Sequence, residues 1–273
     1  MTHSAAARES ATFLGLAYGL ALAVAIVLPH AGINRLLSVL VPVTSVLIIT
    51  FAMTPRGQRR AMWRDIGLSR SGRAVWLMAL VLPMLLLAMA YGTALAMGVA
   101  TLRSFDVTPA GAAEWTANLV VSFIVMTVVY LGEEIGWRGY LLPRVQQLTT
   151  RRRAAVATGL CHGVFHLPLI LIATTYDQHG SRWLVAPVAV LTIAAGGVFY
   201  AYLRDRSDSI WPVAIAHNAA NTLFTIGAAS VVARSETELA YVAGETGFAT
   251  LASVVIVAAI LLATAKVWRN DQA

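Results

Sequence analysis

The sequence predicts an all-α protein, a polytopic transmembrane helical bundle of about eight spans. Of its 273 residues, 58% are hydrophobic and 12% are charged, whereas a soluble domain carries about 25% charged residues. Several apolar runs reach 18 residues or more, which is long enough to cross a bilayer. The cationic residues lie in short loops between these runs, as they do in membrane proteins.

The apolar runs place the expected spans in order along the chain, at residues 11–29, 37–53, 75–98, 116–142, 154–175, 184–203, 210–230 and 248–267. The first run is longer than the core of a signal peptide and further spans follow it, so we expect it to stay as a span. The segment 54–73 is expected to lie partly as an interfacial helix. Because no linker interrupts the pattern, residues 1–273 are expected to form a single integral membrane domain.

The loop charges test this arrangement and predict its orientation. With eight spans, 15 of the 20 Lys and Arg residues fall on one side, four fall on the other, and Arg138 lies within the fourth span. Such asymmetry marks the cytoplasmic side, so we expect a cell-membrane protein with both termini in the cytoplasm. The net charge of +7 is explained by these loops, and we expect the lipid bilayer and no nucleic acid as a partner.

Polar and ionisable residues inside spans are costly, and they mark functional sites by default. They concentrate in three spans. These residues are Glu133, Glu134 and Arg138 in the fourth span, His162 and His166 in the fifth, and His217, Asn218 and Asn221 in the seventh.

Helix geometry separates the two glutamates. Adjacent side chains point about 100° apart, whereas residues four apart share a face. Glu134 is therefore expected to pair with Arg138, in the favourable acid-before-base order. Glu133 has no such local partner and is expected to face histidines of other spans. Counted from the basic loops, Glu133, His166 and His217 all lie roughly 13–20 Å inside the membrane at 1.5 Å per residue.

Polar groups that lie at one depth on three helices suit the activation of water. A carboxylate in a poorly solvated site can act as a general base. His166 beside Glu133 can share that task or bind a metal. His217 and Asn221, one helical turn apart, would present two hydrogen-bond donors that stabilise an oxyanion during amide hydrolysis.

Simpler structural roles compete with these assignments. The carboxylates and Arg138 could form only an ion-pair network between helices, and the histidines could serve interhelical hydrogen bonding. Asn218 points to another helix face, and we expect it to serve packing. A zinc protease of the HExxH type is not indicated, because Gly163 follows His162 where that motif has glutamate.

Taken together, the three clusters resemble the motifs of the CPBP family, also called the Abi family. This family comprises CAAX proteases and bacteriocin-processing enzymes and includes the type II CAAX prenyl endopeptidases. In the order of its motifs EExxxR, FxxxH and HxxxN, the similar residues are Glu133, Glu134 and Arg138, then His166, then His217 and Asn221. They fall within residues 116–230, the expected motif-bearing catalytic core.

The resemblance implies an eight-helix intramembrane endopeptidase. It implies that Glu133 is the base that activates water, with His166 beside it. His217 and Asn221 would stabilise the tetrahedral oxyanion, and Glu134 together with Arg138 would support the site.

One position departs from the family pattern. His162 stands at the aromatic position of FxxxH, where it could alter the pocket wall or add a ligand, and we count it as a supporting residue. Two mechanisms stay open at this point. One uses a divalent metal such as zinc, held by Glu133, His166 and His217, and the other uses no metal.

The leading prediction is therefore an enzyme that hydrolyses a peptide bond of a membrane-associated protein or peptide, at a site open to the cytoplasmic half of the bilayer. One alternative is a non-catalytic membrane protein with an immunity or partner-stabilising function, which would keep the same residues for packing. Another is an ion-coupled transporter. It is disfavoured because the sequence has no internal repeat and no paired broken helices.

Overall fold

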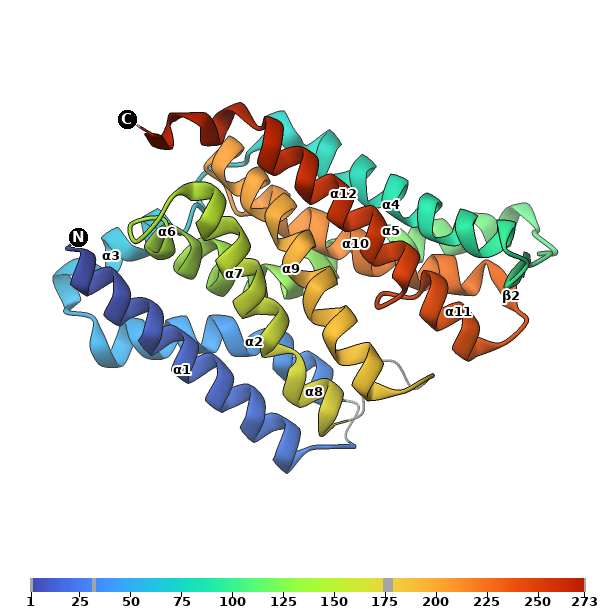
Figure 1. Cartoon of the computed structure of the whole chain (residues 1–273), viewed down its shortest axis with the longest axis horizontal. Helices are drawn as coiled ribbons and strands as arrows, with labels where there is room; N and C mark the ends of the chain where they lie inside the picture. The colour runs from blue at the N-terminus through green and yellow to red at the C-terminus, as the bar shows by residue number, and fades with distance from the viewer. Residues whose placement is uncertain (1, 31–32, 174–178, 273) are drawn as a thin grey trace.

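The computed structural model describes residues 2–30, 33–173 and 179–272, and these form a bundle of tilted helices (Figure 1). Its main helices are α1 (His3–Val27), α2 (Ile33–Ile48), α4 (Trp76–Ala96), α5 (Pro109–Glu134), α7 (Arg151–Phe165), α9 (Arg182–Ser207), α10 (Trp211–Ala229) and α12 (Phe248–Thr264). The shorter helices are α3 (Arg56–Asp65), α6 (Leu142–Val145), α8 (Leu167–Leu171) and α11 (Glu236–Ala243). Strands β1 (Ala100–Leu102) and β2 (Val231–Ala233) form a small antiparallel pair. The prediction of an all-α bundle is confirmed.

Seven helical segments of the described chain are long and apolar enough to cross a membrane. They are His3–Val27, Ile33–Met53, Arg73–Ala96, Pro109–Val145, Arg151–Leu171, Arg182–Ser207 and Glu236–Thr264. The count differs by one from the expected eight because α10, at the expected span 210–230, is not among them. This helix is long enough, but its His and Asn side chains reduce its apolar character, and it packs against α4, α5 and α9. The end of the expected span 154–175 lies outside the described residues.

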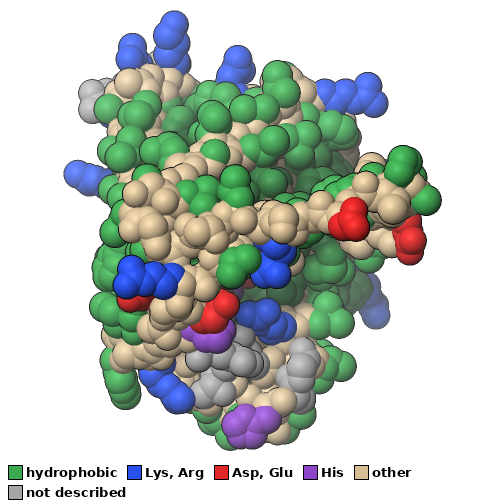
Figure 2. All heavy atoms as spheres, turned by 90° about the vertical axis from the view of Figure 1, so that its right-hand side faces the viewer, with side chains coloured by type: hydrophobic (Ala, Val, Ile, Leu, Met, Phe, Trp, Pro, Cys, Tyr) green, Lys and Arg blue, Asp and Glu red, His purple; other side chains and the backbone are tan. Residues whose placement is uncertain are grey.

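The N- and C-terminal segments lie at the same end of the bundle (Figure 1). Helix α3, which carries four arginines, and the turn between α6 and α7 lie at this end as well. We call it the arginine-rich end. Figure 2 shows the opposite end, where a few charged side chains lie beside broad apolar surface.

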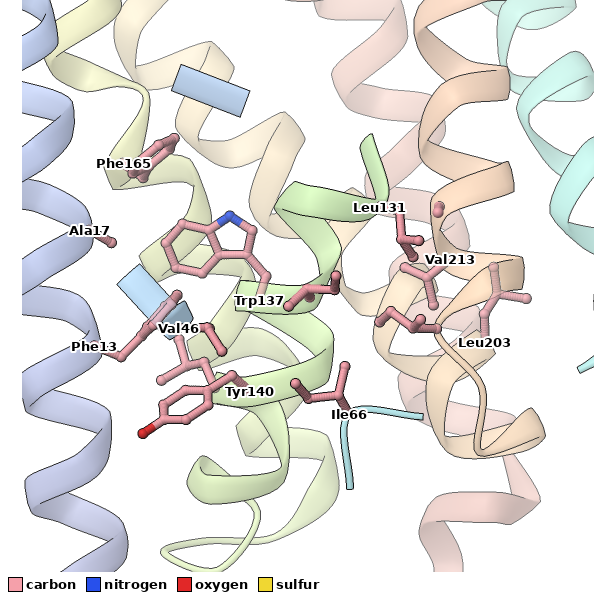
Figure 3. Packing of buried hydrophobic residues seen from close by; sticks show 14 of the residues in the cluster. Phe13, Ala17, Val46, Ile66, Leu131, Trp137, Tyr140, Phe165, Leu203 and Val213 are labelled. Atoms are coloured by element: carbon pink, nitrogen blue, oxygen red, sulfur yellow. The ribbon is translucent and has the colours of Figure 1, made fainter. Parts of the chain in front are cut away.

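An aromatic cluster fixes the chain directly after α5. Residues Ile135–Leu141 form a π-helical segment, a wider turn that occurs often at functional sites. Its Trp137 packs edge-on against Phe13 of α1 and Phe165 of α7, with 5.4 Å between ring centroids in each pair (Figure 3). Trp137 is fully buried. These contacts hold the π-helical segment, and with it the end of α5, against two other helices.

Two glycines allow α7 to approach α9 closely. A Cβ atom at Gly159 would lie 2.5 Å from the Ala194 carbonyl oxygen, and one at Gly163 would lie 2.6 Å from the Val190 carbonyl oxygen. Real Cβ atoms are not found that close to backbone, so only glycine fits at these two positions. Small residues at such crossings let helix backbones touch in membranes. The contact sets the position of the α7 residues that follow each glycine.

We expect Gly159→Ala to lower the free energy of unfolding by about 1–3 kcal/mol, because the added methyl group overpacks the α7–α9 contact. Thermal unfolding of the purified protein in detergent measures this. Gly92→Ala in α4 is the matched control, since nothing lies within 4 Å of a Cβ atom at Gly92. Equal melting temperatures for the two variants would show that the contact has no such constraint.

Candidate active site

Glu134 and Arg138 form a buried ion pair. Nη1 of Arg138 lies 3.1 Å from each carboxylate oxygen of Glu134, and the two side chains are 1% and 0% exposed. The pairing that the sequence spacing indicated is therefore present. Nδ1 of His217 also lies 2.8 Å from Oε1 of Glu134, which ties α10 to the end of α5.

Glu133 points away from this pair and toward the histidines. Its Oε1 lies 2.8 Å from Nε2 of His162 and 3.7 Å from Nε2 of His166. Its Oε2 lies 3.9 Å from Nε2 of His217. The carboxylate is only 2% exposed. Histidines of α7 and α10, together with His166 at the junction of α7 and α8, thus converge on one carboxylate of α5.

His162 connects Glu133 with the Glu134–Arg138 ion pair. Its Nδ1 lies 2.9 Å from Nη1 of Arg138, and its Nε2 contacts Glu133. The imidazole stacks on Trp137 with 4.8 Å between centroids and 24° between planes. The sequence alone indicated a supporting residue at this position and did not indicate the contact with Arg138.

Two tyrosines enclose His217. Tyr130 stacks on one side with a centroid separation of 4.7 Å, and Tyr200 stacks on the other at 5.5 Å. Neither tyrosine was predicted from the sequence. Tyr130 precedes Glu133 by three residues on α5 and therefore shares its face, which was a usable signal. Tyr200 lies on α9, and no spacing in the sequence connects it with the site.

The two asparagines of α10 differ in their surroundings. Asn221 lines the cavity together with Glu133 and Tyr130. Asn218 is buried, and its Nδ2 donates to the Phe123 carbonyl oxygen at 2.7 Å and to Thr127 Oγ1 at 2.9 Å. Asn218 therefore holds α10 against α5, which is the packing role expected for it.

The histidines, Glu133 and Asn221 line a cavity of about 230 Å³. Its walls come from α2, α4, α5, α7, α9, α10 and α12 and are mostly apolar. The lining continues from Glu133 to Arg35 near the start of α2, and to Glu245 between α11 and α12. The start of α2 lies at the end opposite the arginine-rich end (Figure 1). The cavity therefore extends from the carboxylate away from the basic loops.

Some of these side chains could bind a metal ion. Among the described residues, possible ligand atoms of Glu133, His162 and His166 lie within 4.8 Å of one another, and His217 is not part of that group. His217 nevertheless suits a metal ligand, because Nδ1 donates to Glu134 and leaves Nε2 facing Glu133. A carboxylate that orients a histidine in this way is typical of metal sites. The expected set of Glu133, His166 and His217 thus fits a divalent ion chemically.

Comparison with known families agrees with this geometry. Residues 113–223 match the family described as type II CAAX prenyl endopeptidase Rce1-like. Over this segment, which is less than half of the chain, the protein is similar to the CAAX protease family. The matched segment contains every residue of the site from Glu133 to Asn221. In general terms, this similarity supports the function of a CAAX-type intramembrane endopeptidase that acts on a membrane-embedded peptide or protein. No curated protein matches the chain.

Proposed function

We propose that this protein is a CAAX-type protease, which cleaves a membrane-associated protein or peptide with a water molecule that Glu133 activates. One observation carries the proposal. A buried carboxylate faces His166 at 3.7 Å and His217 at 3.9 Å at the wall of a largely apolar cavity. A general base in such surroundings removes a proton from water efficiently because solvent does not compete for it.

The reaction is then an ordinary addition and elimination. Glu133 takes a proton from water, and the oxygen attacks the carbonyl carbon of the peptide bond. Asn221 donates a hydrogen bond to the oxyanion that forms, and the imidazolium form of His217, which carries protons on both ring nitrogens, donates a second one from Nε2. The C–N bond breaks, and the proton held by Glu133 passes to the leaving amine. His166 lies beside Glu133 and orients the water.

A divalent metal would be held by Glu133, His166 and His217, and when bound it supplies Lewis acidity to the attacked carbonyl and a more acidic water. The assignment of Asn221 as an oxyanion donor does not depend on it, because such a donor is needed in either case. His217 is an oxyanion donor only where Nε2 holds no metal, since a ligating nitrogen carries no hydrogen.

For the direction of access, we propose that the scissile bond lies in the cytoplasmic half of the bilayer of the cell membrane. The positive-inside rule assigns the arginine-rich end to the cytoplasm, and Glu133 is eleven residues from Arg144 at that end. The bound substrate chain runs from Glu133 along the cavity toward Arg35 and Glu245, because the cavity lining extends that way.

The experiment that tests the function is comparative peptidomics. Membranes from cells that carry the wild type, Glu133→Gln or Asp65→Asn are compared for peptide termini. Asp65 is the matched control because it is an exposed carboxylate on α3, with a side chain 69% exposed. We expect a set of termini that appears with the wild type and Asp65→Asn and is absent with Glu133→Gln. Identical termini in all three would refute the proposal.

Asn221→Ala is expected to lower kcat by about 10²–10³-fold, the usual effect of removing one oxyanion donor. KM should change little, because the hydrogen bond strengthens only as charge develops on the oxygen. Steady-state kinetics on a peptide from the peptidomics measures both constants. Thr225→Ala on the same helix is the control, since Thr225 is exposed. A change confined to KM would assign Asn221 to substrate binding instead.

A further inference from the structure

Arg138 determines which nitrogen of His162 carries the proton. Nη1 of Arg138 lies 2.9 Å from Nδ1 of His162, and a guanidinium can only donate hydrogen bonds. Nδ1 must therefore be the acceptor and carry no hydrogen. A neutral imidazole has one N–H group, so the proton is on Nε2. That Nε2–H group lies 2.8 Å from Oε1 of Glu133 and donates to it.

The same contacts exclude His162 from a metal site. A metal ligand must offer a nitrogen lone pair, but one nitrogen of His162 accepts from Arg138 and the other donates to Glu133. His162 is one of the three residues whose ligand atoms lie closest together. The hydrogen-bond pattern nevertheless makes it a donor to the carboxylate.

The ring is held rigidly in this orientation. It stacks on the buried Trp137, and Gly163, the next residue, lies against the α9 backbone at Val190. A donor that is fixed on both sides directs the carboxylate of Glu133. Oε1 of Glu133 accepts from His162. The other carboxylate oxygen, Oε2, lies on the side of His217, 3.9 Å from Nε2 of that residue.

We propose that His162 is a positioning residue, which transmits the orientation of Arg138 to Glu133 and leaves Oε2 as the oxygen that receives the proton from water. This rests on the proposed function of Glu133. It also explains why a histidine can stand at the aromatic position of the motif. The ring still stacks on Trp137 as an aromatic residue would, and it adds one acceptor and one donor.

Two substitutions separate this role from packing and from metal binding. His162→Phe keeps an aromatic ring and removes both hydrogen bonds. His162→Gln keeps one acceptor for Arg138 and one donor for Glu133, and its amide is not a good metal ligand. We expect His162→Phe to lower kcat by about 10- to 100-fold, the rate equivalent of one charge-assisted hydrogen bond, with KM within about twofold of wild type. His162→Gln should recover most of the lost kcat, and His3→Gln should equal the wild type.

Two kinetic outcomes would overturn the proposal. One is His162→Phe with the kcat of the wild type, and the other is His162→Gln as inactive as His162→Phe. Melting temperatures of all variants are recorded alongside. If His162→Phe does not fold, the comparison of His162→Gln with the wild type and the spectroscopic measurement decide.

The spectroscopic measurement does not depend on activity. The protein, with its histidine rings labelled with ¹⁵N, is purified in detergent micelles, and long-range ¹H–¹⁵N correlations report which ring nitrogen is protonated. The His162 signal is the one absent from His162→Gln. We expect a protonated Nε2 and an unprotonated Nδ1, whereas a proton on Nδ1 would overturn the proposal. A protonated Nε2 in a protein that cleaves no peptide would refute the proposed function and leave the tautomer assignment standing.

Discussion

Glu133→Gln is expected to lower kcat by about 10²–10⁴-fold, the range that general base catalysis contributes. The amide of glutamine cannot take a proton from water. It keeps the volume of the side chain and an oxygen that accepts from the Nε2–H group of His162, 2.8 Å away in the native site. We therefore expect a folded protein and a KM within about twofold of wild type. Initial rates of the purified variant on a peptide cleaved by the wild type measure both.

The control for this experiment is Asp65→Asn, which changes an exposed carboxylate to an amide and should leave kcat unaltered. Retention of more than about a tenth of the wild-type kcat by Glu133→Gln would contradict the assignment, because a residual rate that high is above the range for loss of a general base.

The second large effect is expected on stability. Arg138→Met should lower the free energy of unfolding by about 3–5 kcal/mol, the cost of leaving a buried charge without its partner. Both side chains of the Arg138–Glu134 pair are at most 1% exposed, and Nδ1 of His162 loses its donor as well. Glu134→Gln should be destabilising in the same direction. Thermal or denaturant unfolding in detergent, together with the yield of folded protein, measures the loss.

Arg70 and Asp208 provide the matched comparison. They form an ion pair at 2.5 Å whose side chains are 63% and 65% exposed, and an exposed pair contributes at most about 1 kcal/mol. Asp208→Asn also suits the left-handed backbone at this position, φ 52°, which Asn tolerates. A loss for Arg138→Met no larger than for Asp208→Asn would mean that the buried pair does not stabilise the fold.

These two predictions assign different roles to neighbouring acids. Glu134 accepts from Arg138 and His217 and has no exposed surface, so its substitution should mainly affect folding. Glu133 lies at the cavity wall, so its substitution should mainly affect the rate. A variant of Glu133 that fails to fold, or a variant of Glu134 that folds normally and loses only kcat, would reverse the assignment.

The sequence by itself determined the membrane class, most of the span positions and the Glu134–Arg138 pair. Each of these depends on local information. Apolar runs are read directly along the chain, and residues four apart on a helix meet whatever the rest of the fold does. The depth count also brought Glu133, His166 and His217 to one level, because helix rise is constant.

Only the tertiary structure decided which of the polar groups at this depth in the membrane contact one another. His162 is 24 residues from Arg138 and 29 from Glu133, and Tyr200 meets His217 from a different helix. Such contacts depend on how each helix is rotated and how closely it approaches its neighbour. Here Gly159 and Gly163 set the approach of α7 to α9, and the π-helical turn Ile135–Leu141 sets the rotation of the residues after Glu134. These contacts depend on packing between segments that are distant in the sequence, so they cannot be predicted from residue spacing within one helix.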